Sequence, residues 1–239
     1  MKQLHLISGG AAQGLMAAVG DSFAAKHGFA LEGTFGAVGL MKDKLLGGSP
    51  CDVVILTAAL IAELELQGHV DPGSARSLGV VRTGVAVRTG AAVPDIATPE
   101  ALATVLRKAK GIYFPDPVKA TAGIHFMKVL KLLDLDQELA DRLMPFPNGA
   151  TAMRAMAAAA GQQALVGCTQ ITEINFTPGV QLAGVLPSAF ELATVYTAAV
   201  CRRAANPVAA HALVKLLASD ASAAQRLASG FEDQRPQKT

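Results

Sequence analysis

Short apolar runs alternate with helical patterns along most of the chain. Residues 4–7 form a short, mostly apolar run, and 53–56 have the unbroken hydrophobicity of a strand that is buried on both faces of a parallel sheet. After the first run, apolar residues between Leu15 and Phe23 recur three and four positions apart, which is the spacing of one helix face. The alternation of strand and helix predicts an α/β fold with doubly wound, mostly parallel sheets.

The remaining elements follow from the same periodicities and from the residues that start and stop helices. Thr98 and Pro99 form a helix start, Thr151 is the expected cap of a later helix, and Gly28 ends the first helix. We predict strands over 4–7, 29–35, 52–56, 78–88, 112–114, 164–168, 180–185 and 194–201. We predict helices over 11–27, 40–46, 58–67, 99–110, 124–133, 134–143 and 151–160, from 171 onward, and over 207–218 and 221–229, with a loop at 145–149. Strands 78–88 and 194–201 are long enough to cross from one lobe into another and back.

Small residues and hydroxyl groups stand at the ends of several predicted strands, just before helices. A strand that turns through such residues into a helix leaves unpaired backbone N–H groups at the positive end of the helix dipole, which suits an anion. In an open parallel sheet these turns meet at the carboxyl ends of the strands. The candidate ligand-binding residues are Ser8, Gly9, Gly10, Ala37, Val38, Thr57, Thr121, Ala122, Thr169 and Gln170. Together they predict a site for a small anion, although each turn taken alone also fits a purely structural role.

Cationic side chains lie in or near the same segments. Arg82, Arg88 and Lys119 are candidates for the counter-charge of the anion, and arginine can hold a carboxylate through two parallel hydrogen bonds. His125 lies one turn into the helix that follows the Thr121 turn, where it is a candidate general acid or base. A structural or solvent-exposed histidine fits the same pattern.

Composition and charge argue against several other functions. The net charge is +2 without a dense basic run, and two Tyr and no Trp leave few side chains for base stacking, so nucleic-acid binding is not expected. No stretch approaches the roughly 20 apolar residues that span a bilayer, so membrane insertion is not expected. The sequence has neither a P-loop nor a G-x-G-x-x-G motif, and its His and Cys lack the spacing of zinc ligands. We therefore expect no cofactor and no metal.

The three cysteines bear on the cellular compartment. Cys51, Cys168 and Cys201 are odd in number and two lie in apolar runs, which suits free thiols better than a disulfide framework. Cys168, near the predicted site, fits a packed thiol and also a nucleophile. Met1 to Gln3 lead directly into the first strand without the apolar segment of a secretory signal. We expect a cytoplasmic protein, or a periplasmic one if a signal was trimmed from this chain.

Taken in order, the strand ends resemble those of the type II periplasmic solute-binding proteins, within them the molybdate-binding branch of ABC transport systems. The similar segments, which together cover nearly the whole length, are Ser8-Gly9-Gly10-Ala11, Thr34 to Gly39, Cys51 to Thr57, Asp116 to Gly123 and Gly167 to Glu173. Members of this branch usually hold the oxyanion with a serine in each of the first two turns. Here Ser8 occupies the first turn, and 36–39 carry no hydroxyl, so the resemblance implies an altered oxyanion site. The segments 119–126 and 167–170 resemble a side branch that includes aconitate isomerase.

The resemblance implies a two-lobed fold in which each lobe is a mostly parallel sheet flanked by helices. Lobe one would comprise 1–82 plus 195–239 and lobe two 83–194, with the ligand in a cleft between them. The implied function is a receptor for a small anion, here an organic carboxylate, with an ABC permease as partner if the protein is exported.

The side branch implies an alternative function, an isomerase that shifts a proton and a double bond on an unsaturated di- or tricarboxylic acid. His125 is then the candidate base, and Lys119, Arg82 and backbone N–H groups would hold the carboxylates.

Overall fold

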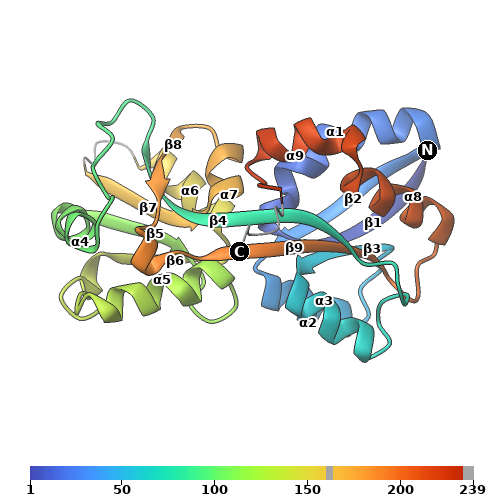
Figure 1. The fold of residues 1–239 in the computed structure, drawn as a ribbon, viewed down its shortest axis with the longest axis horizontal. Helices are drawn as coiled ribbons and strands as arrows, with labels where there is room; N and C mark the ends of the chain where they lie inside the picture. The colour runs from blue at the N-terminus through green and yellow to red at the C-terminus, as the bar shows by residue number, and fades with distance from the viewer. Residues whose placement is uncertain (160–163, 234–239) are drawn as a thin grey trace, which may run out of the picture. The chain divides into compact units, whose positions relative to one another are not determined.

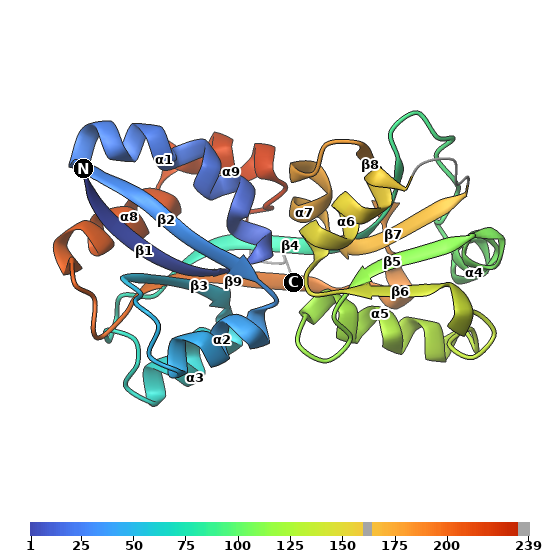
Figure 2. The ribbon, with the colours of Figure 1, turned by 180° about the vertical axis from the view of Figure 1, so that it is seen from behind.

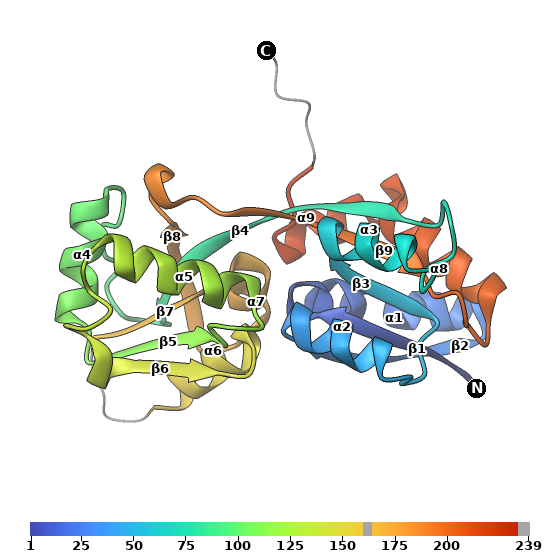
Figure 3. The same cartoon turned by 90° about the horizontal axis from the view of Figure 1, so that it is seen from below.

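The computed structural model describes residues 1–159 and 164–233 of the chain, which divides into two compact units. Unit 1 comprises Met1–Val81 with Thr194–Thr239, and unit 2 comprises Arg82–Ala193. The chain passes from unit 1 to unit 2 within a long strand, β4 (Arg76–Arg88), and returns at the start of another, β9 (Ala193–Val200) (Figure 3). That a ligand binds between the two units stays a prediction.

Unit 1 is built on a sheet with the strand order β2-β1-β3-β9. Strand β1 pairs parallel with β2 and with β3, and β9 pairs antiparallel with β3. Helices α1, α8 and α9 lie on one face of this sheet and α2 and α3 on the other (Figures 1 and 2). The elements are β1 (Lys2–Gly9), a 3-10 turn η1 (Gly10–Ala12), α1 (Gln13–His27), β2 (Phe29–Gly36), α2 (Val38–Leu46), β3 (Val53–Thr57), α3 (Ala58–Leu66), α8 (Pro207–Ala218), η4 (Asp220–Ser222) and α9 (Ala223–Ser229).

The core of unit 1 follows the apolar pattern of the sequence. The side chains of Val53 to Leu56 are fully buried, as expected of a strand covered by helices on both faces. The apolar face of α1, from Leu15 to Phe23, belongs to the same core cluster. The helix ends where predicted, because Gly28 takes the left-handed conformation (φ 74°) that terminates a helix and that glycine adopts without strain.

Unit 2 repeats this plan with the strand order β4-β7-β5-β6, and β8 pairs with β4. Strand β5 pairs parallel with β6 and β7, whereas β7 and β8 run antiparallel to β4. The elements after β4 are α4 (Pro99–Lys108), β5 (Gly111–Pro115), α5 (Thr121–Leu132), η2 (Ala140–Arg142), β6 (Leu143–Phe146), α6 (Gly149–Ala158), β7 (Leu165–Gln170), α7 (Ile171–Phe176), β8 (Val180–Val185) and η3 (Ser188–Phe190).

The sheet of unit 2 has a hydrophobic cluster on each face. Ile112 and Phe114 of β5 belong to the cluster that includes α4 and α5, and Tyr113 belongs to the one that includes α6 and α7. Consecutive strand residues point to opposite faces, so a fully apolar strand serves both clusters. The predicted start of α4 is confirmed, because Thr98 accepts a hydrogen bond from the N–H of Ala101 at 3.2 Å.

Three local predictions differ from the structure. The predicted helix over 134–143 is wrong: Asp134 has φ 54°, one α-turn joins Leu139 N–H to the carbonyl of Leu135, and η2 follows. Both leucines are fully buried, so their spacing reflects a single packed turn. Part of the predicted loop at 145–149 belongs to β6, which is an edge strand, the kind of strand in which proline is tolerated.

The cap of α6 also differs from the prediction. Asn148, and not Thr151, starts the helix: its side-chain oxygen accepts from the N–H of Thr151 at 2.9 Å. Helix α6 is described to Ala158, and its predicted end at residue 160 lies outside the described residues.

Candidate functional site

In unit 1 three parallel strands bring their predicted site residues to one edge of the sheet. Ser8 of β1 stands opposite Phe35 of β2 and Ile55 of β3, so the carboxyl ends of the three strands are level. The residues that follow each strand start the 3-10 turn η1, helix α2 and helix α3. The residues gathered at this edge are Ser8, Gly9, Gly10, Ala37, Val38 and Thr57.

The turn at Gly9 is packed so tightly that only glycine fits. A Cβ on this residue would lie 2.8 Å from Cγ1 of Val38 and 3.1 Å from Cε1 of Tyr196. The end of β1 therefore lies directly against the first residue of α2 and against Tyr196 of β9. Tyr196 had no prediction attached to it, because its place at this edge depends on the antiparallel register of β9, in which it stands opposite Thr57.

Hydroxyl groups at this edge are partly engaged within the protein. The buried Ser8 hydroxyl donates to the carbonyl of Gly9 at 2.9 Å. Thr57 Oγ1 accepts from the N–H of Leu60 at 3.4 Å, which caps α3. By contrast, Gly9 before η1 and Ala37 before α2 give no side-chain cap, so backbone N–H groups are the donors that these two turns offer.

In unit 2 the corresponding edge carries the starts of α5, α6 and α7. Strands β6, β5 and β7 run parallel, so their carboxyl ends share one edge of the sheet. Thr121 and Ala122 are the first residues of α5, and Thr169 and Gln170 end β7. The structure thus gathers these four predicted residues at one edge of unit 2.

The turn before α5 is held in one conformation. The Asp116 carboxylate accepts from the N–H groups of Val118 and Lys119 at 2.7 and 2.8 Å. A Cβ on Gly123 would lie 2.2 Å from the carbonyl oxygen of Pro115, so the first turn of α5 sits directly against the end of β5. Helix α5 has no side-chain cap, which leaves the backbone N–H groups of its first turn facing outward from the helix start.

Gln170 is the most unusual polar residue at this edge. Its side chain is 3% exposed, yet within the described part of the chain neither its amide nitrogen nor its amide oxygen has a hydrogen-bond partner. Thr83 of β4 stands opposite Gln170 in the antiparallel register, and its buried hydroxyl likewise lacks a described partner. Directly opposite residues share a face of the sheet, so the two side chains belong to one buried polar group. Thr83 was not predicted.

Glu173 is a second residue that the sequence prediction missed. Its buried carboxylate accepts from the Thr169 hydroxyl at 2.6 Å and from the backbone N–H groups of Gly149, Ala150 and Gln170. Burial raises the pKa of Glu173 above its ordinary value, and these four donors partly offset the effect of burial. A Cβ on Gly149 would lie 2.0 Å from the carboxylate, so glycine is required there. The N–H groups at the start of α6 are therefore already paired with a carboxyl group of the protein itself.

Two of the predicted cations, Arg82 and Lys119, and the candidate base His125 lie beside this edge. Arg82 is half-buried in β4 and forms an ion pair with Glu191. Because strand neighbours point to opposite faces, Arg82 and Thr83 point apart. Lys119 is exposed in the turn before α5. His125 is half-buried on α5, with Nε2 2.8 Å from the carbonyl oxygen of Phe190, so one ring nitrogen is already engaged.

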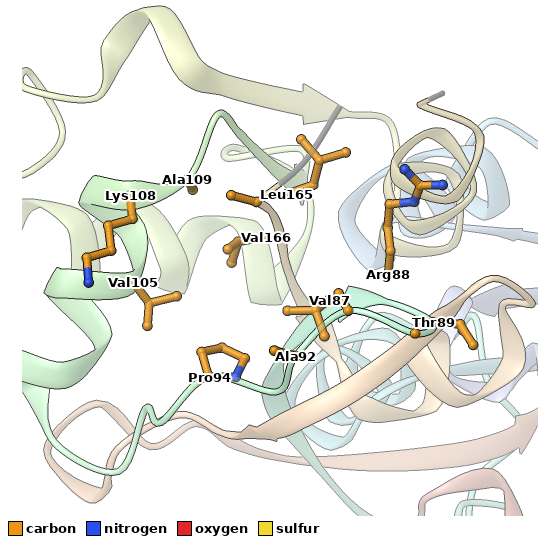
Figure 4. Close-up of a pocket in the computed structure, with 13 residues that line it drawn as sticks. Val87, Arg88, Thr89, Ala92, Pro94, Val105, Lys108, Ala109, Leu165 and Val166 are labelled. Atoms are coloured by element: carbon orange, nitrogen blue, oxygen red, sulfur yellow. The ribbon is translucent and has the colours of Figure 1, made fainter. Parts of the chain in front are cut away.

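A cavity of about 560 Å³ lies at the opposite end of the unit 2 strands. It is lined by the start of β7 at Leu165 and Val166, the end of β4 at Val87 and Arg88, and α4. Figure 4 shows Lys108 and Arg88 at opposite sides of the lining with apolar side chains between them. Arg88 donates to the carbonyl of Ala159 at 3.0 Å. The structure therefore places Arg88 at the far end of the strands from the other residues predicted to bind the anion.

The described residues contain neither a cluster of metal-ligating side chains nor a helix that could span a membrane. Over 1–159 and 164–233, no group of three or more His, Cys, Asp or Glu side chains is placed to hold a metal ion. In the same residues no helix has both the length and the apolar character needed to cross a membrane.

Comparison with known proteins gives a family and a fold. The family model of the bacterial extracellular solute-binding proteins matches residues 4–232. An aconitate isomerase of a Pseudomonas species is 29% identical over 181 residues, which cover 74% of this chain. The chain spans 65% of the length of that relative.

Solved structures of periplasmic binding proteins have the same fold. The periplasmic molybdate-binding protein of Azotobacter vinelandii superposes with a TM-score of 0.79 at 20% identity, over 98% of this chain and 100% of that one. A sulfate-binding protein of Mycobacterium tuberculosis gives a TM-score of 0.73 at 18% identity, over 99% and 88% of the two chains. A periplasmic thiamin-binding protein gives 0.71 at 14% identity, over 99% and 86%. The predicted periplasmic-binding-protein fold is confirmed, and these identities speak for the fold alone.

Proposed function

The chain belongs to the family of bacterial extracellular solute-binding proteins, and we propose that it binds a small organic anion that carries a carboxylate. The proposed binding groups are the strand ends described above. They offer backbone N–H donors at helix starts that no side chain caps, which is a chemistry suited to anions in general. The choice of a carboxylate rests on the side chains among them.

Gln170 is the observation that carries this choice. A buried amide without a partner is unfavourable in the free protein, and a ligand that pairs with it removes that penalty. The amide presents both a donor and an acceptor. A fully deprotonated oxyanion such as molybdate or sulfate offers acceptors only, and would leave the amide oxygen unpaired. A carboxylic acid that also carries a hydroxyl or a protonated carboxyl group satisfies both atoms.

The hydroxyl groups of unit 1 support the same choice. The proton of the Ser8 hydroxyl is directed to the carbonyl of Gly9, and the second turn consists of Gly36, Ala37, Val38 and Gly39 without a hydroxyl. Few hydroxyl donors therefore remain to surround a tetrahedral oxyanion.

The test is a binding panel on the purified chain. Isothermal titration calorimetry would compare di- and tricarboxylates, with and without a hydroxyl group, against molybdate and sulfate. We expect binding of at least one carboxylate and none of the inorganic ions. Binding of molybdate or sulfate with no response to any carboxylate would contradict the proposal.

A second function, isomerisation of an unsaturated carboxylic acid, has a specific observation in its favour. Glu173 is a buried carboxyl group with a raised pKa, and it is hydrogen-bonded to the backbone N–H of Gln170. A buried carboxyl group with a raised pKa is a candidate for a group that both donates and accepts a proton in catalysis. The similarity to an aconitate isomerase points to the same chemistry. His125 stays a candidate base through its Nδ1 atom, since Nε2 faces the carbonyl of Phe190.

Proton NMR in D2O separates binding from turnover. If the protein is an isomerase, cis- or trans-aconitate incubated with it loses a C–H signal to deuterium or yields the peaks of the other isomer. Broadened lines without exchange would leave a binding protein. His125→Ala and Glu173→Gln variants then test the two candidate bases. If one of these variants retains full turnover, the residue that it replaces is not the base.

The proposed partner depends on the cellular location of the protein. An ABC permease is the proposed partner of an exported form, and a cytoplasmic form would act without one. Fractionation of cells that produce the full-length gene product, followed by immunoblotting, distinguishes the two.

A further inference from the structure

Two of the three cysteines lie next to each other in unit 1. Cys51 precedes β3 and is half-buried, whereas Cys201 follows β9 and is buried. The Sγ atoms are 3.2 Å apart, and the Cys201 thiol donates a hydrogen bond to the Cys51 sulfur. The two sulfur atoms are not bonded to each other in this structure.

The backbone around the pair is held by several hydrogen bonds. Strands β3 and β9 pair antiparallel up to Val53 and Val200, and the N–H of Cys201 donates to the carbonyl of Asp52 at 2.9 Å. The Asp52 carboxylate accepts from the N–H groups of His5 and Asn206 at 2.9 and 2.8 Å. Because the backbone on both sides is fixed, the two sulfurs stay close in the native state.

We propose that Cys51 and Cys201 form a disulfide bond when the protein meets an oxidising thiol–disulfide environment. A disulfide has an S–S distance of about 2.05 Å, so bond formation requires the sulfurs to approach by little more than about 1 Å. The bond would join positions 150 residues apart in the sequence. It would tie the entry of β3 to the exit of β9, at the end of the unit 1 sheet away from Ser8 and Thr57.

The reaction needs an oxidant, and a small disulfide such as oxidised glutathione supplies it. The Cys51 thiol loses its proton, and the thiolate attacks one glutathione sulfur, which forms a mixed disulfide and releases one glutathione thiolate. The Cys201 thiol then loses its proton, its sulfur attacks the Cys51 sulfur, and the S–S bond to glutathione breaks; the second glutathione leaves as a thiolate and takes up a proton. The two cysteines are oxidised by two electrons in total, and one disulfide is reduced to two thiols.

The order of the two steps follows from access. Cys51 is half-buried and the more accessible of the two, while Cys201 is buried. The hydrogen bond to Cys51, together with burial, raises the pKa of the Cys201 thiol, which makes it the poorer first nucleophile. Cys168 is fully buried in β7 of unit 2, and burial raises its pKa as well, so it serves as an internal control.

The experiment measures free thiols in the native protein after incubation in glutathione buffers of increasing oxidised fraction. Samples are quenched with acid, denatured and alkylated, and their intact mass and peptides are determined by mass spectrometry. We expect alkylation of all three cysteines under reducing conditions and of Cys168 alone under oxidising ones, with a cross-linked peptide that joins residues 51 and 201.

Matched variants make the assignment specific. The Cys168→Ser variant should still lose two free thiols on oxidation. The Cys51→Ser variant should form no intrachain disulfide bond. The oxidised wild type should melt at a temperature roughly 10 °C above the reduced form, because the bond closes a long loop in the unfolded chain. Full alkylation of three thiols after oxidation, a stable glutathione adduct on Cys51, or a cross-link to Cys168 would each overturn the proposal. These outcomes leave the anion-binding proposal untouched, because the pair lies away from the predicted site residues.

Discussion

Replacement of Gln170 by methionine distinguishes a residue that binds the ligand from one that stabilises the fold. Loss of a binding residue weakens ligand affinity, whereas loss of a structural residue lowers the free energy of unfolding. Methionine is close to glutamine in length and volume, but has no amide group. In the ligand-free protein the Gln170 amide is buried, and neither polar atom has a partner among the described residues. Removal of the amide therefore breaks no described hydrogen bond within the protein. The variant should be at least as stable as the wild type, and weaker in binding.

The magnitudes follow from the two states of the amide. A buried polar group without a partner costs about 1–3 kcal/mol, so Gln170→Met should raise the free energy of unfolding of the ligand-free protein by up to about that amount. In the complex, a hydrogen bond to a charged ligand contributes about 1.5–3 kcal/mol. Loss of that bond should weaken binding by about 10- to 100-fold.

Urea denaturation gives the first quantity and calorimetric titration of the best ligand gives the second. Gln137→Met is the matched control, because Gln137 is exposed and donates to the neighbouring Asp136 at 3.2 Å. Both quantities should stay within about 0.5 kcal/mol of the wild type in this control. A Gln170→Met protein that is less stable by more than about 1 kcal/mol would mean that the amide is bonded inside the protein. Unchanged affinity would place Gln170 outside the binding site.

Two further substitutions test the framework of the unit 2 edge. Gly123→Ala should lower the free energy of unfolding by about 1–3 kcal/mol or more, because the new Cβ would lie 2.2 Å from the carbonyl oxygen of Pro115. The control is Gly20→Ala on α1, which has open space around it and should raise the free energy of unfolding by about 0.5–1 kcal/mol. Equal effects of the two substitutions in urea denaturation would contradict this prediction. Glu173→Gln removes a carboxyl group whose folded-state pKa is raised by burial above its ordinary value of 4.5, so the native state binds the proton more tightly than the unfolded chain. The stability of the wild type relative to this variant should be greatest below pH 4.5 and should decline as the pH rises through the folded-state pKa, and a difference that stays flat or grows between pH 4 and 8 would show that the sign is wrong.

Elements with strong local signals could be predicted from the sequence. The apolar strand at Val53, the capped start at Thr98 and the stop at Gly28 depend on neighbouring residues, and the structure has all three where expected. The segment over 134–143 was predicted wrongly because a spacing of four between buried leucines is shared by a full helix and by a single packed turn. Strand β6 was missed because Pro145 is unfavourable in a central strand and acceptable at an edge, and the strand order is not visible in the sequence.

The candidate site could be predicted only as far as its turns. The positions of the turns after the strands could be predicted because small residues before helices are a local pattern in the sequence. Thr83 and Tyr196 were missed because each reaches its edge through an antiparallel register with a distant segment. Glu173 was not predicted as a site residue, because its donors include Gly149 and Ala150 from another helix.

The carboxylate of Glu173 has a consequence for the energetics of any ligand that unit 2 receives. When a ligand anion binds at an unoccupied helix start, the N–H donors become ordered during binding. The conformational entropy lost in that step weakens the affinity. At the start of α6 the N–H groups of Gly149 and Ala150 are already ordered by a covalently attached carboxylate. The conformational entropy of ordering these two N–H groups is therefore lost when the protein folds, and not when a ligand binds. This part of the unit 2 edge is ordered before any ligand arrives, and in the proposed complex the groups that remain to contact the ligand are the first turn of α5 and the amide of Gln170.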